Sequence, residues 1–328
     1  MALVDLPLEQ LWRYRPDREE PADFDAFWVR SLTEARRFPL DAVLRRQDGP
    51  LTLVDVFEVE FAGFGGHRIG GWFLRPRHHP EPLPCVVRYL GYTVGRGHPH
   101  QWLSLPACGL ATLVMDTRGQ SGTPDPAGGS GAEVPGFLTR GLAGPETYYY
   151  RRVYVDAVRA VEAAGALPGV DPSRIAVAAG SQGAGVGLAV AGLASARLRA
   201  VLLDVPSLTM FRRATEIGAG GSRAELVAYL QAHRGREEDV FTTLSYFDGV
   251  NFAARARVPA WFSAALMDPV CPPSTVFAAY HHYAGEKHMR VWPYNGHEGG
   301  GGDQEAEHLE LLVSLLGGDV SIADGTGT

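Results

Sequence analysis

The fold is decided by one stretch of ten residues, Arg174-Ile-Ala-Val-Ala-Ala-Gly-Ser-Gln-Gly183. Its first part, Arg174–Ala179, is a short apolar run without alternation, which indicates a strand covered on both faces. A serine turn follows directly, and Gly183–Ala196 then has the composition of a helix packed closely on a sheet. Strand, serine turn and helix in this order are typical of a nucleophile elbow, G-x-S-x-G, with Ala179 in place of the first glycine.

Part of this stretch also meets the length criterion for a membrane span, because Ile175–Ala196 contains no charged residue. Five of its residues are glycines, and a Ser181-Gln182 pair interrupts it. A buried strand, a turn and a helix explain these residues better than one membrane helix does. The sequence therefore predicts no membrane-spanning segment and no membrane partner.

Short apolar runs alternate with helical stretches on both sides of the elbow. The expected strands are Val54–Glu60, His67–Arg75, Cys85–Leu90, Leu110–Asp116, Arg174–Ala179, Ala200–Val205, Ala260–Leu266 and Met289–Pro293. The expected helices are Pro21–Arg37, Thr147–Ala164, Gly183–Ala196, Tyr246–Arg255, Pro273–Tyr283 and Gln304–Leu316. This alternation predicts the α/β class, with a mostly parallel central sheet and helices on both of its faces.

No repeat or low-complexity linker divides the chain, so residues 1–328 are expected to form one domain. Residues 1–40 are interpreted as an acidic N-terminal arm. Residues from about 206 to 245 break the α/β rhythm and are interpreted as a helical insertion over the sheet edge. Residues from about 317 to 328 are expected to form a flexible tail.

Composition excludes several classes of protein. The content of 45% hydrophobic residues argues against a disordered chain. The 30 Lys+Arg against 37 Asp+Glu give a net charge of −7, and an acidic chain without basic blocks gives no support to nucleic-acid binding. Met1 is not followed by a basic segment and an apolar core, so no secretion signal is found and a cytoplasmic location is expected.

Neither a disulfide framework nor a metal site is indicated. Cys85, Cys108 and Cys271 are widely spaced and form no C-x-x-C pair. His98 and His100 have H-x-H spacing, but no Asp, Glu or Cys nearby completes a zinc site. No metal is therefore expected.

Three residues follow the order Ser, acid, His that an elbow of this kind requires. A serine hydroxyl becomes a nucleophile when a histidine takes its proton, and a carboxylate orients that histidine. Ser181 lies in the elbow, Asp268 lies two residues past the strand Ala260–Leu266, and His297 lies four residues past Pro293. Taken singly, Asp268 could belong to an Asp-Pro turn and His297 to an exposed glycine-rich loop. Their joint position at successive strand ends favours a catalytic triad.

Acyl transfer also needs two hydrogen-bond donors for the oxyanion. The main-chain N–H of Gln182, directly after the nucleophile, is one candidate. The second is expected in the loop after an early strand, where Gly91-Tyr92 follows Cys85–Leu90. The alternative is that Gly91-Tyr92 is only a turn. The residues therefore predict an oxyanion hole formed by the main-chain N–H of Gln182 and one from Gly91-Tyr92.

Three short motifs resemble the signatures of carbohydrate esterase family 7, which comprises acetyl xylan esterases and cephalosporin C deacetylases. They are Arg118-Gly119-Gln120, Gly180-Ser181-Gln182-Gly183 and His297-Glu298. Longer segments are also similar to that family: Asp5–Leu11, Thr147–Glu162, Thr243–Asp248 and Pro272–Tyr280. The resemblance covers nearly the whole chain and implies the α/β-hydrolase fold.

The resemblance implies the same triad, Ser181, Asp268 and His297, and an oxyanion hole formed by the main-chain N–H groups of Tyr92 and Gln182. It also implies a preference for short acyl groups, chiefly acetyl, no cofactor, and a homo-oligomer that in this family is often a hexameric ring. The motif Arg118-Gly119-Gln120 is expected to tie loops together beneath the site. The glycines of Gly299–Gly302 are expected to loosen the wall beside His297.

The sequence thus predicts a serine esterase that removes acetyl groups from small acetylated sugars, such as xylo-oligosaccharides, or from cephalosporin-type esters. The acyl group passes through Ser181, and water activated by His297 releases acetate. Two alternatives remain open. One is a tailoring esterase, amidase or lactonase for a larger acyl group, and the other is a non-catalytic binding protein with a hydrolase fold.

Overall fold

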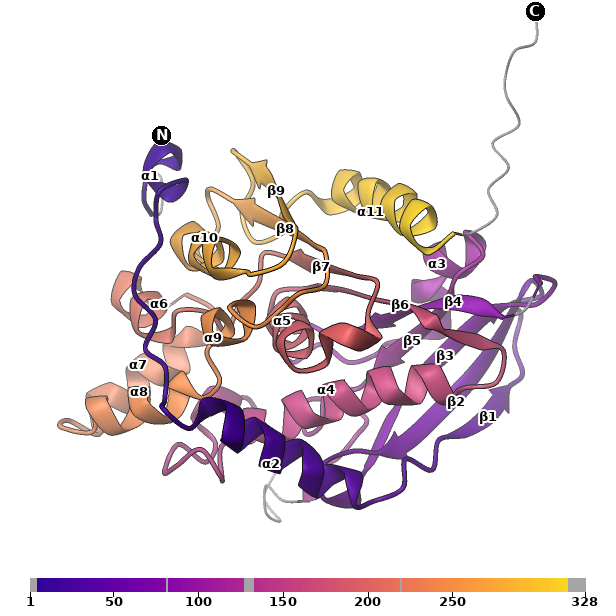
Figure 1. Ribbon diagram of the computed structural model, residues 1–328, viewed down its shortest axis with the longest axis horizontal. Coiled ribbons are helices and arrows are strands. Elements are labelled where there is room, and N and C mark those ends of the chain that lie inside the picture. Colours follow the sequence, from indigo (N-terminus) through magenta and orange to yellow (C-terminus); the bar gives the residue numbers. More distant parts are fainter. Residues whose placement is uncertain (1–4, 81, 127–132, 219, 318–328) are drawn as a thin grey trace, which may run out of the picture.

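The computed structural model describes residues 5–80, 82–126, 133–218 and 220–317 (Figure 1). Within them, nine strands form one sheet in the order β1-β2-β3-β5-β4-β6-β7-β8-β9. The strands are β1 (Val43–Gln47), β2 (Val54–Ala62), β3 (Arg68–Pro76), β4 (Leu83–Arg88), β5 (Ala111–Met115), β6 (Val170–Gly180), β7 (Ala200–Asp204), β8 (Ala260–Ala265) and β9 (Lys287–Trp292). The pairs β1–β2, β2–β3 and β3–β5 are antiparallel, whereas all pairs from β5 to β9 are parallel. The predicted α/β class with a mostly parallel sheet is confirmed.

Helices cover both faces of this sheet (Figure 1). The α-helices of the described residues are α1 (Leu8–Leu11), α2 (Phe24–Arg36), α3 (Ser104–Ala107), α4 (Tyr149–Ala166), α5 (Gln182–Ala194), α6 (Phe211–Ile217), α7 (Arg223–Ala232), α8 (Glu237–Ser245), α9 (Gly249–Ala253), α10 (Pro273–His282) and α11 (Gly301–Leu316). Helices α4 and α5 pack on one face, and α3 and α11 lie on the other. None of the helices in the described parts of the chain is long and apolar enough to cross a membrane.

The central strand β6 shows why its sequence does not alternate. Val177 and Ala179 face the larger core, to which α4 and α5 contribute. Ala176 and Ala178 face a smaller core that contains Leu312 of α11. Successive side chains of a strand point to opposite faces, so both sets are apolar when both faces are covered.

The strand order reverses at β4, which has β5 on one side and β6 on the other. At such a point the loops that follow two neighbouring parallel strands diverge and leave a crevice at their carboxyl ends. The loop after β4 carries Gly91-Tyr92, and the turn after β6 carries Ser181. The topology therefore places the predicted nucleophile beside the predicted oxyanion loop.

The predicted N-terminal arm contributes to the main core. Phe24, Phe27 and Trp28 of α2 are each 1% exposed and belong to the larger core. The Trp28 indole N–H donates to the Tyr246 carbonyl at 2.9 Å, which links the arm to the residues after α8. Residues 1–4 of the predicted arm lie outside the described residues.

The interval predicted as a helical insertion contains α6, α7 and α8. The end of the fold is α11, which stops at Gly317, a residue with the left-handed φ of 65° that favours glycine. The rest of the predicted tail, residues 318–328, lies outside the described residues.

The structure differs from the predicted elements in several places. Strand β6 begins at Val170 rather than Arg174, and the short helices α1 and α3 were not predicted. Strand β1 was not predicted, because its last three residues are exposed and Arg45 and Arg46 leave it without an apolar pattern. The predicted helix Tyr246–Arg255 is shortened to α9. Its later start is explained by Asp248, which caps the N-terminus of the helix by accepting the main-chain N–H of Val250.

Candidate active site

The elbow at Ser181 has the backbone geometry that the sequence motif predicts. Ser181 has φ 56° and ψ −124°, a strained conformation for a residue other than glycine. Its N–H donates to the Asp204 carbonyl of β7 at 2.9 Å, which fixes the turn to the neighbouring strand. A Cβ on Gly183 would lie 2.3 Å from the Tyr89 carbonyl oxygen. The helix α5 therefore approaches this closely only because residue 183 is glycine.

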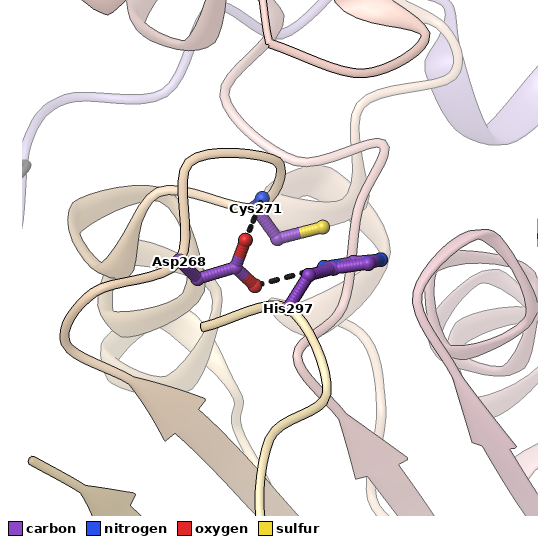
Figure 2. A group of neighbouring side chains, drawn as sticks. All are labelled: Asp268, Cys271 and His297. Atoms are coloured by element: carbon purple, nitrogen blue, oxygen red, sulfur yellow. Dashed lines mark hydrogen bonds and ion pairs between the residues drawn. The ribbon is translucent and has the colours of Figure 1, made fainter. Parts of the chain in front are cut away.

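The three predicted triad residues lie in one chain of hydrogen bonds. His297 Nε2 is 2.9 Å from the Ser181 hydroxyl. On the other side of the ring, His297 Nδ1 is 2.9 Å from Asp268 Oδ2 (Figure 2). The Asp268 side chain is 0% exposed, whereas the His297 side chain is 34% exposed. A buried carboxylate on Nδ1 fixes the histidine tautomer and leaves Nε2 free to accept the serine proton.

The turn after β8 holds the acid in place. Asp268 Oδ1 accepts the main-chain N–H groups of Val270 at 2.7 Å and Cys271 at 2.9 Å, while Oδ2 faces His297. These bonds satisfy both oxygens of the buried carboxylate. The Asp-Pro sequence thus forms a turn and presents the acid to His297 at the same time.

Cys271 lies beside the triad, although the sequence analysis assigned it no role. Figure 2 shows its side chain next to Asp268 and His297, and the metal-binding atoms of these three residues lie within 4.8 Å of one another. The hydrogen bonds of the triad already account for the carboxylate and both imidazole nitrogens. Burial, together with the nearby Asp268 charge, raises the pKa of the Cys271 thiol, so this group stays protonated.

The two predicted oxyanion donors lie on segments that Gln182 joins. The Gln182 side-chain amide donates to the carbonyls of Leu90 at 3.2 Å and Gly91 at 3.3 Å. Its Oε1 accepts the Tyr150 hydroxyl of α4 at 2.8 Å. Within the described residues the main-chain N–H groups of Tyr92 and Gln182 form no hydrogen bond, so both are available to an oxyanion.

Gln120, from the Arg118-Gly119-Gln120 motif, connects both sides of the predicted oxyanion hole. Its Oε1 accepts the main-chain N–H of Thr93, the residue after Tyr92, at 2.8 Å. Its amide also forms a reciprocal pair with the Gln182 amide, at 2.9 and 3.0 Å. The sequence predicts that this motif ties loops together, and the structure identifies which loops they are.

Arg118, the first residue of the Arg118-Gly119-Gln120 motif, is held by buried ion pairs. Its guanidinium is 0% exposed and lies 2.5 and 2.7 Å from the two carboxylate oxygens of Asp156 and 3.3 Å from Asp125. Asp156 belongs to α4 and also accepts the Phe64 N–H at 2.8 Å. Because Arg118 is paired with Asp156 of α4, the segment that carries Gln120 is tied to that helix. Breaking this buried ion pair would leave an uncompensated charge, so the connection is costly to lose.

Ser181 and His297 open into a cavity of about 450 Å³. Tyr92 lies on one side of it, and residues of the helical insertion, among them Phe211 and Leu226, lie on another. Most of the lining side chains are apolar, so a bound ester would be shielded from water next to the nucleophile.

Arg223, at the start of α7, links the insertion to the acid turn. Its guanidinium donates to the Ala214 carbonyl and, at 2.6 Å, to the Pro269 carbonyl next to Asp268. Burial lowers the pKa of Arg223. Among the described residues, its Nε and the Thr209 hydroxyl are buried side-chain atoms without a hydrogen-bond partner, and both residues line the cavity. The insertion therefore contributes polar groups as well as apolar wall.

In the loop after His297, one glycine packs closely on β9. A Cβ on Gly300 would lie 2.3 Å from the Trp292 ring, so the absence of a side chain allows direct contact between this loop and β9. Gly301 then begins α11. A Cβ on Gly301 or Gly302 would meet no atom within 4 Å, so the close packing is confined to Gly300, and the predicted loosening of the wall beside His297 stays a prediction.

The profile of the acetyl xylan esterase (AXE1) family matches residues 1–315 of this chain. The chain belongs to the acetyl xylan esterase family. A solved acetyl xylan esterase from Paenibacillus sp. R4 is 40% identical, with a TM-score of 0.89 over 95% of this chain and 100% of that one. Acetyl xylan esterase 1 from Thermoanaerobacterium sp. JW/SL YS485 is 31% identical, with a TM-score of 0.88 over 95% of this chain and 99% of that one.

The acetyl esterase Axe7A of Xylanibacter ruminicola is a longer relative of this acetyl xylan esterase family member. It is 29% identical over 297 residues, which are 86% of this chain, and the chain spans 65% of the length of Axe7A. Together with the sheet topology, these similarities confirm the predicted family and the predicted α/β-hydrolase fold.

Proposed function

We propose that this protein hydrolyses acetyl and other short acyl esters of small, carbohydrate-like alcohols. The observation that carries the proposal is the hydrogen-bonded set of Ser181, His297 and Asp268 at a nucleophile elbow, in a chain of the acetyl xylan esterase family. Relatives named acetyl xylan esterase and acetyl esterase support acetate as the acyl group. Acetylated xylo-oligosaccharides are the first substrates to examine, and cephalosporin-type acetates are a second class for the same reaction.

The acylation half of the reaction follows from the positions of the side chains. His297 Nε2 accepts the Ser181 proton while Oγ attacks the ester carbonyl carbon, and Asp268 stabilises the imidazolium that forms. The main-chain N–H groups of Tyr92 and Gln182 bind the negative carbonyl oxygen. The bond to the alcohol then breaks, and His297 returns the proton to the leaving alkoxide.

The second half of the reaction uses the same groups with water as the nucleophile. His297 takes a proton from water, and the hydroxide attacks the acyl carbon on Ser181. The bond to Oγ breaks, Ser181 recovers its proton from His297, and the carboxylic acid leaves. Every side chain returns to its starting state.

Hydrolysis of p-nitrophenyl acetate, butyrate and octanoate tests this proposal in the wild type, in Ser181→Ala and in the control Ser245→Ala at the end of α8. We expect acetate turnover to fall by about 1000-fold or more in Ser181→Ala, because the covalent route is lost. We expect turnover by the wild type to decrease steeply from acetate to octanoate. Ser245→Ala should match the wild type.

The other outcomes separate the alternatives. Equal or faster hydrolysis of octanoate that still depends on Ser181 would replace the acetyl preference with a larger acyl group. Activity that survives Ser181→Ala would overturn the mechanism. No activity and no labelling of Ser181 by a fluorophosphonate would favour a non-catalytic binding protein.

The assembly state and the location are proposals of the same kind. We propose that the protein is a homo-oligomer, and the hexameric ring that is frequent in its family is the first state to examine. We also propose a cytoplasmic location. Sedimentation velocity measures the mass of the assembly directly, and a monomer across the micromolar range would contradict the oligomer.

A further inference from the structure

A second cavity, of about 330 Å³, lies between α11 and the sheet. Its wall includes Arg88 at the end of β4, Thr112 in β5 and Asp204 at the end of β7. Figure 1 shows α11 and α3 over this face of the sheet, opposite α4 and α5. This cavity shares no lining residue with the one at Ser181, although Glu298, which follows His297, is part of its wall.

Small residues on the central strand leave this space open. In the sheet, Gly180 pairs with Asp204 on one side of β6, and Arg88 lies on β4 on the other side. Ala178 belongs to the core on the α11 face. Side chains two residues apart in a strand lie on the same face, so a side chain at position 180 would also lie on the α11 face, and Gly180 has none. No long side chain of β6 therefore fills the gap between the guanidinium and the carboxylate.

Two donor groups in this wall have no hydrogen-bond acceptor among the described residues. The Thr112 hydroxyl is fully buried and is one of the buried side-chain atoms without a hydrogen bond among the described residues. Arg88 forms no hydrogen bond or ion pair within the described parts of the chain, and its guanidinium carbon lies 5.8 Å from the centre of the Trp102 ring. Buried polar groups are normally satisfied, so these two indicate a ligand or ordered water.

The same wall also carries acceptors with spare capacity. Asp204 accepts the Ser263 hydroxyl at 2.9 Å through Oδ1, and its Oδ2 is 3.5 Å from His308 Nδ1. Glu305 accepts the Ser104 hydroxyl at 3.0 Å. Each carboxylate has about four acceptor positions, so lone pairs remain on both groups. The cavity thus presents donors and acceptors, and charges of both signs, to its contents.

We propose that this cavity is a binding site for a neutral saccharide of one or two sugar units. The wall combines the Arg88 guanidinium with the carboxylates of Asp204, Glu298 and Glu305, so a cation and an anion would each meet like charge as well as opposite charge. A sugar hydroxyl is both donor and acceptor, so it pairs with either kind of group. The Trp102 ring and leucine side chains of α11 offer apolar surface to the C–H groups of a sugar ring. The volume is near the lower end of the range for small-molecule sites.

This proposal does not depend on the reaction at Ser181, and its test measures binding with the first cavity closed. Ser181 is modified with a small fluorophosphonate, and xylose and xylobiose are then titrated by calorimetry and by saturation-transfer NMR. We expect one site per chain. We expect glucuronate and glucosamine, the charged probes, to bind at least fivefold more weakly than xylose.

Two variants assign the binding to this cavity. Thr112→Val removes a hydroxyl with little change of volume, and Arg88→Met removes the guanidinium but keeps an apolar chain. We expect the affinity for xylobiose to fall at least fivefold in each variant. Xylobiose should raise the melting temperature of the wild type, and this increase should be smaller in both variants. Thr242→Val, at an exposed position of α8, is the matched control and should bind as the wild type does.

Three results would overturn the proposed saccharide site. No binding of either neutral sugar to the wild type, or unchanged affinity in a folded Thr112→Val protein, would overturn the proposal. Tighter binding of glucuronate than of xylose would assign an anion site and overturn it as well. If Ser181 does not react with the fluorophosphonate, the proposed hydrolysis is in question, and the titration of the unmodified protein still decides the saccharide site.

Discussion

Gly183 is a residue of the site at which there is no room for a side chain. It lies where α5 passes the end of β4, and a Cβ there would lie 2.3 Å from the Tyr89 carbonyl oxygen. We expect Gly183→Ala to lower the free energy of unfolding by about 1–3 kcal/mol, because the backbone must move to accept the methyl group. The turnover of p-nitrophenyl acetate should fall as the elbow shifts.

Urea unfolding and initial rates measure both effects. Gly302→Ala is the matched control, because no atom lies within 4 Å of the Cβ it would gain in the first turn of α11. Equal losses in the two variants would show that the close approach at Gly183 is not the cause.

His308 is a second residue whose surroundings determine its state. The Trp292 indole N–H donates to Gln304 Oε1 at 2.8 Å, so the Gln304 amide nitrogen faces His308 Nε2, also at 2.8 Å. His308 Nε2 is then an acceptor, and its proton lies on Nδ1, toward Asp204. Burial, and then the charge of Arg88, lower the pKa of His308 to about 4.

This lowered pKa predicts sensitivity to acid. An unfolded histidine takes up its proton near pH 6.5 and folded His308 near pH 4, so between these values the unfolded state binds more protons. The stabilising contribution is complete above pH 6.5 and is lost as the pH falls toward 4, by about 3 kcal/mol. We expect His308→Gln, which keeps an acceptor for Gln304, to show a smaller decrease of the urea midpoint between pH 7 and pH 4.5.

The exposed His288 gives the control for this measurement. His288→Gln should show the same decrease as the wild type. If all three proteins lose stability equally between the two pH values, another group is responsible for the acid sensitivity.

At the scale of elements, helix α7 holds the turn after β4. The Tyr92 hydroxyl donates to Glu225 of α7 and accepts the Phe137 N–H at 3.0 Å. Glu225 also accepts the Leu138 N–H at 3.0 Å. The insertion therefore contacts the oxyanion turn through side chains of both partners, and a shift of α7 would be transmitted to Tyr92.

Tyr92→Phe tests this connection, because it keeps the main-chain N–H and removes the hydroxyl. We expect the free energy of unfolding to fall by about 1.5–3 kcal/mol, the range for a hydrogen bond to a charged group, and kcat for p-nitrophenyl acetate to decrease. Tyr246→Phe removes a comparable bond to Asp23 at the surface and should leave kcat unchanged. A wild-type kcat in Tyr92→Phe would show that α7 does not position the turn.

The elements could be predicted where their own residues carry the signal. Strands β4 and β6 are apolar on both faces because helices cover both sides, so their sequences identify them. Strand β1 could not be predicted, because Val43–Gln47 is an edge strand defined by its pairing with β2 rather than by its own residues. The start of α9 depends on the Asp248 cap, which a pattern of apolar residues does not report.

The site divides in the same way. Ser181, Asp268 and His297 could be predicted because each follows a strand, and the order of the strands in the chain fixes the order of the residues. Gln120 could be recognised only as part of a motif, because its partners lie 27 and 62 positions away. Arg88 gave no signal, since in the sequence it is one polar residue within a buried strand.

At the scale of the whole molecule, one core joins the arm, the sheet and the insertion. It contains Trp28 of α2, Val177 of β6, Phe211 of α6 and Leu226 of α7. We expect one cooperative unfolding transition, because the arm and the insertion bury their apolar side chains in this shared core. Calorimetry and tryptophan fluorescence should give the same midpoint, and a separate early transition of either part would contradict this expectation.

The position of Cys271 has a consequence for the response to oxidants. Alkylating agents and peroxides react with the thiolate, and a buried thiol with a raised pKa is almost free of that form at neutral pH. Cys271 is 2% exposed, and burial raises the pKa of its thiol just as it raises that of Cys85 to about 12. Iodoacetamide and mild peroxide should therefore leave Cys271 unmodified. Because the nucleophile is a serine, the protein should keep its activity under conditions that inactivate an enzyme whose nucleophile is cysteine.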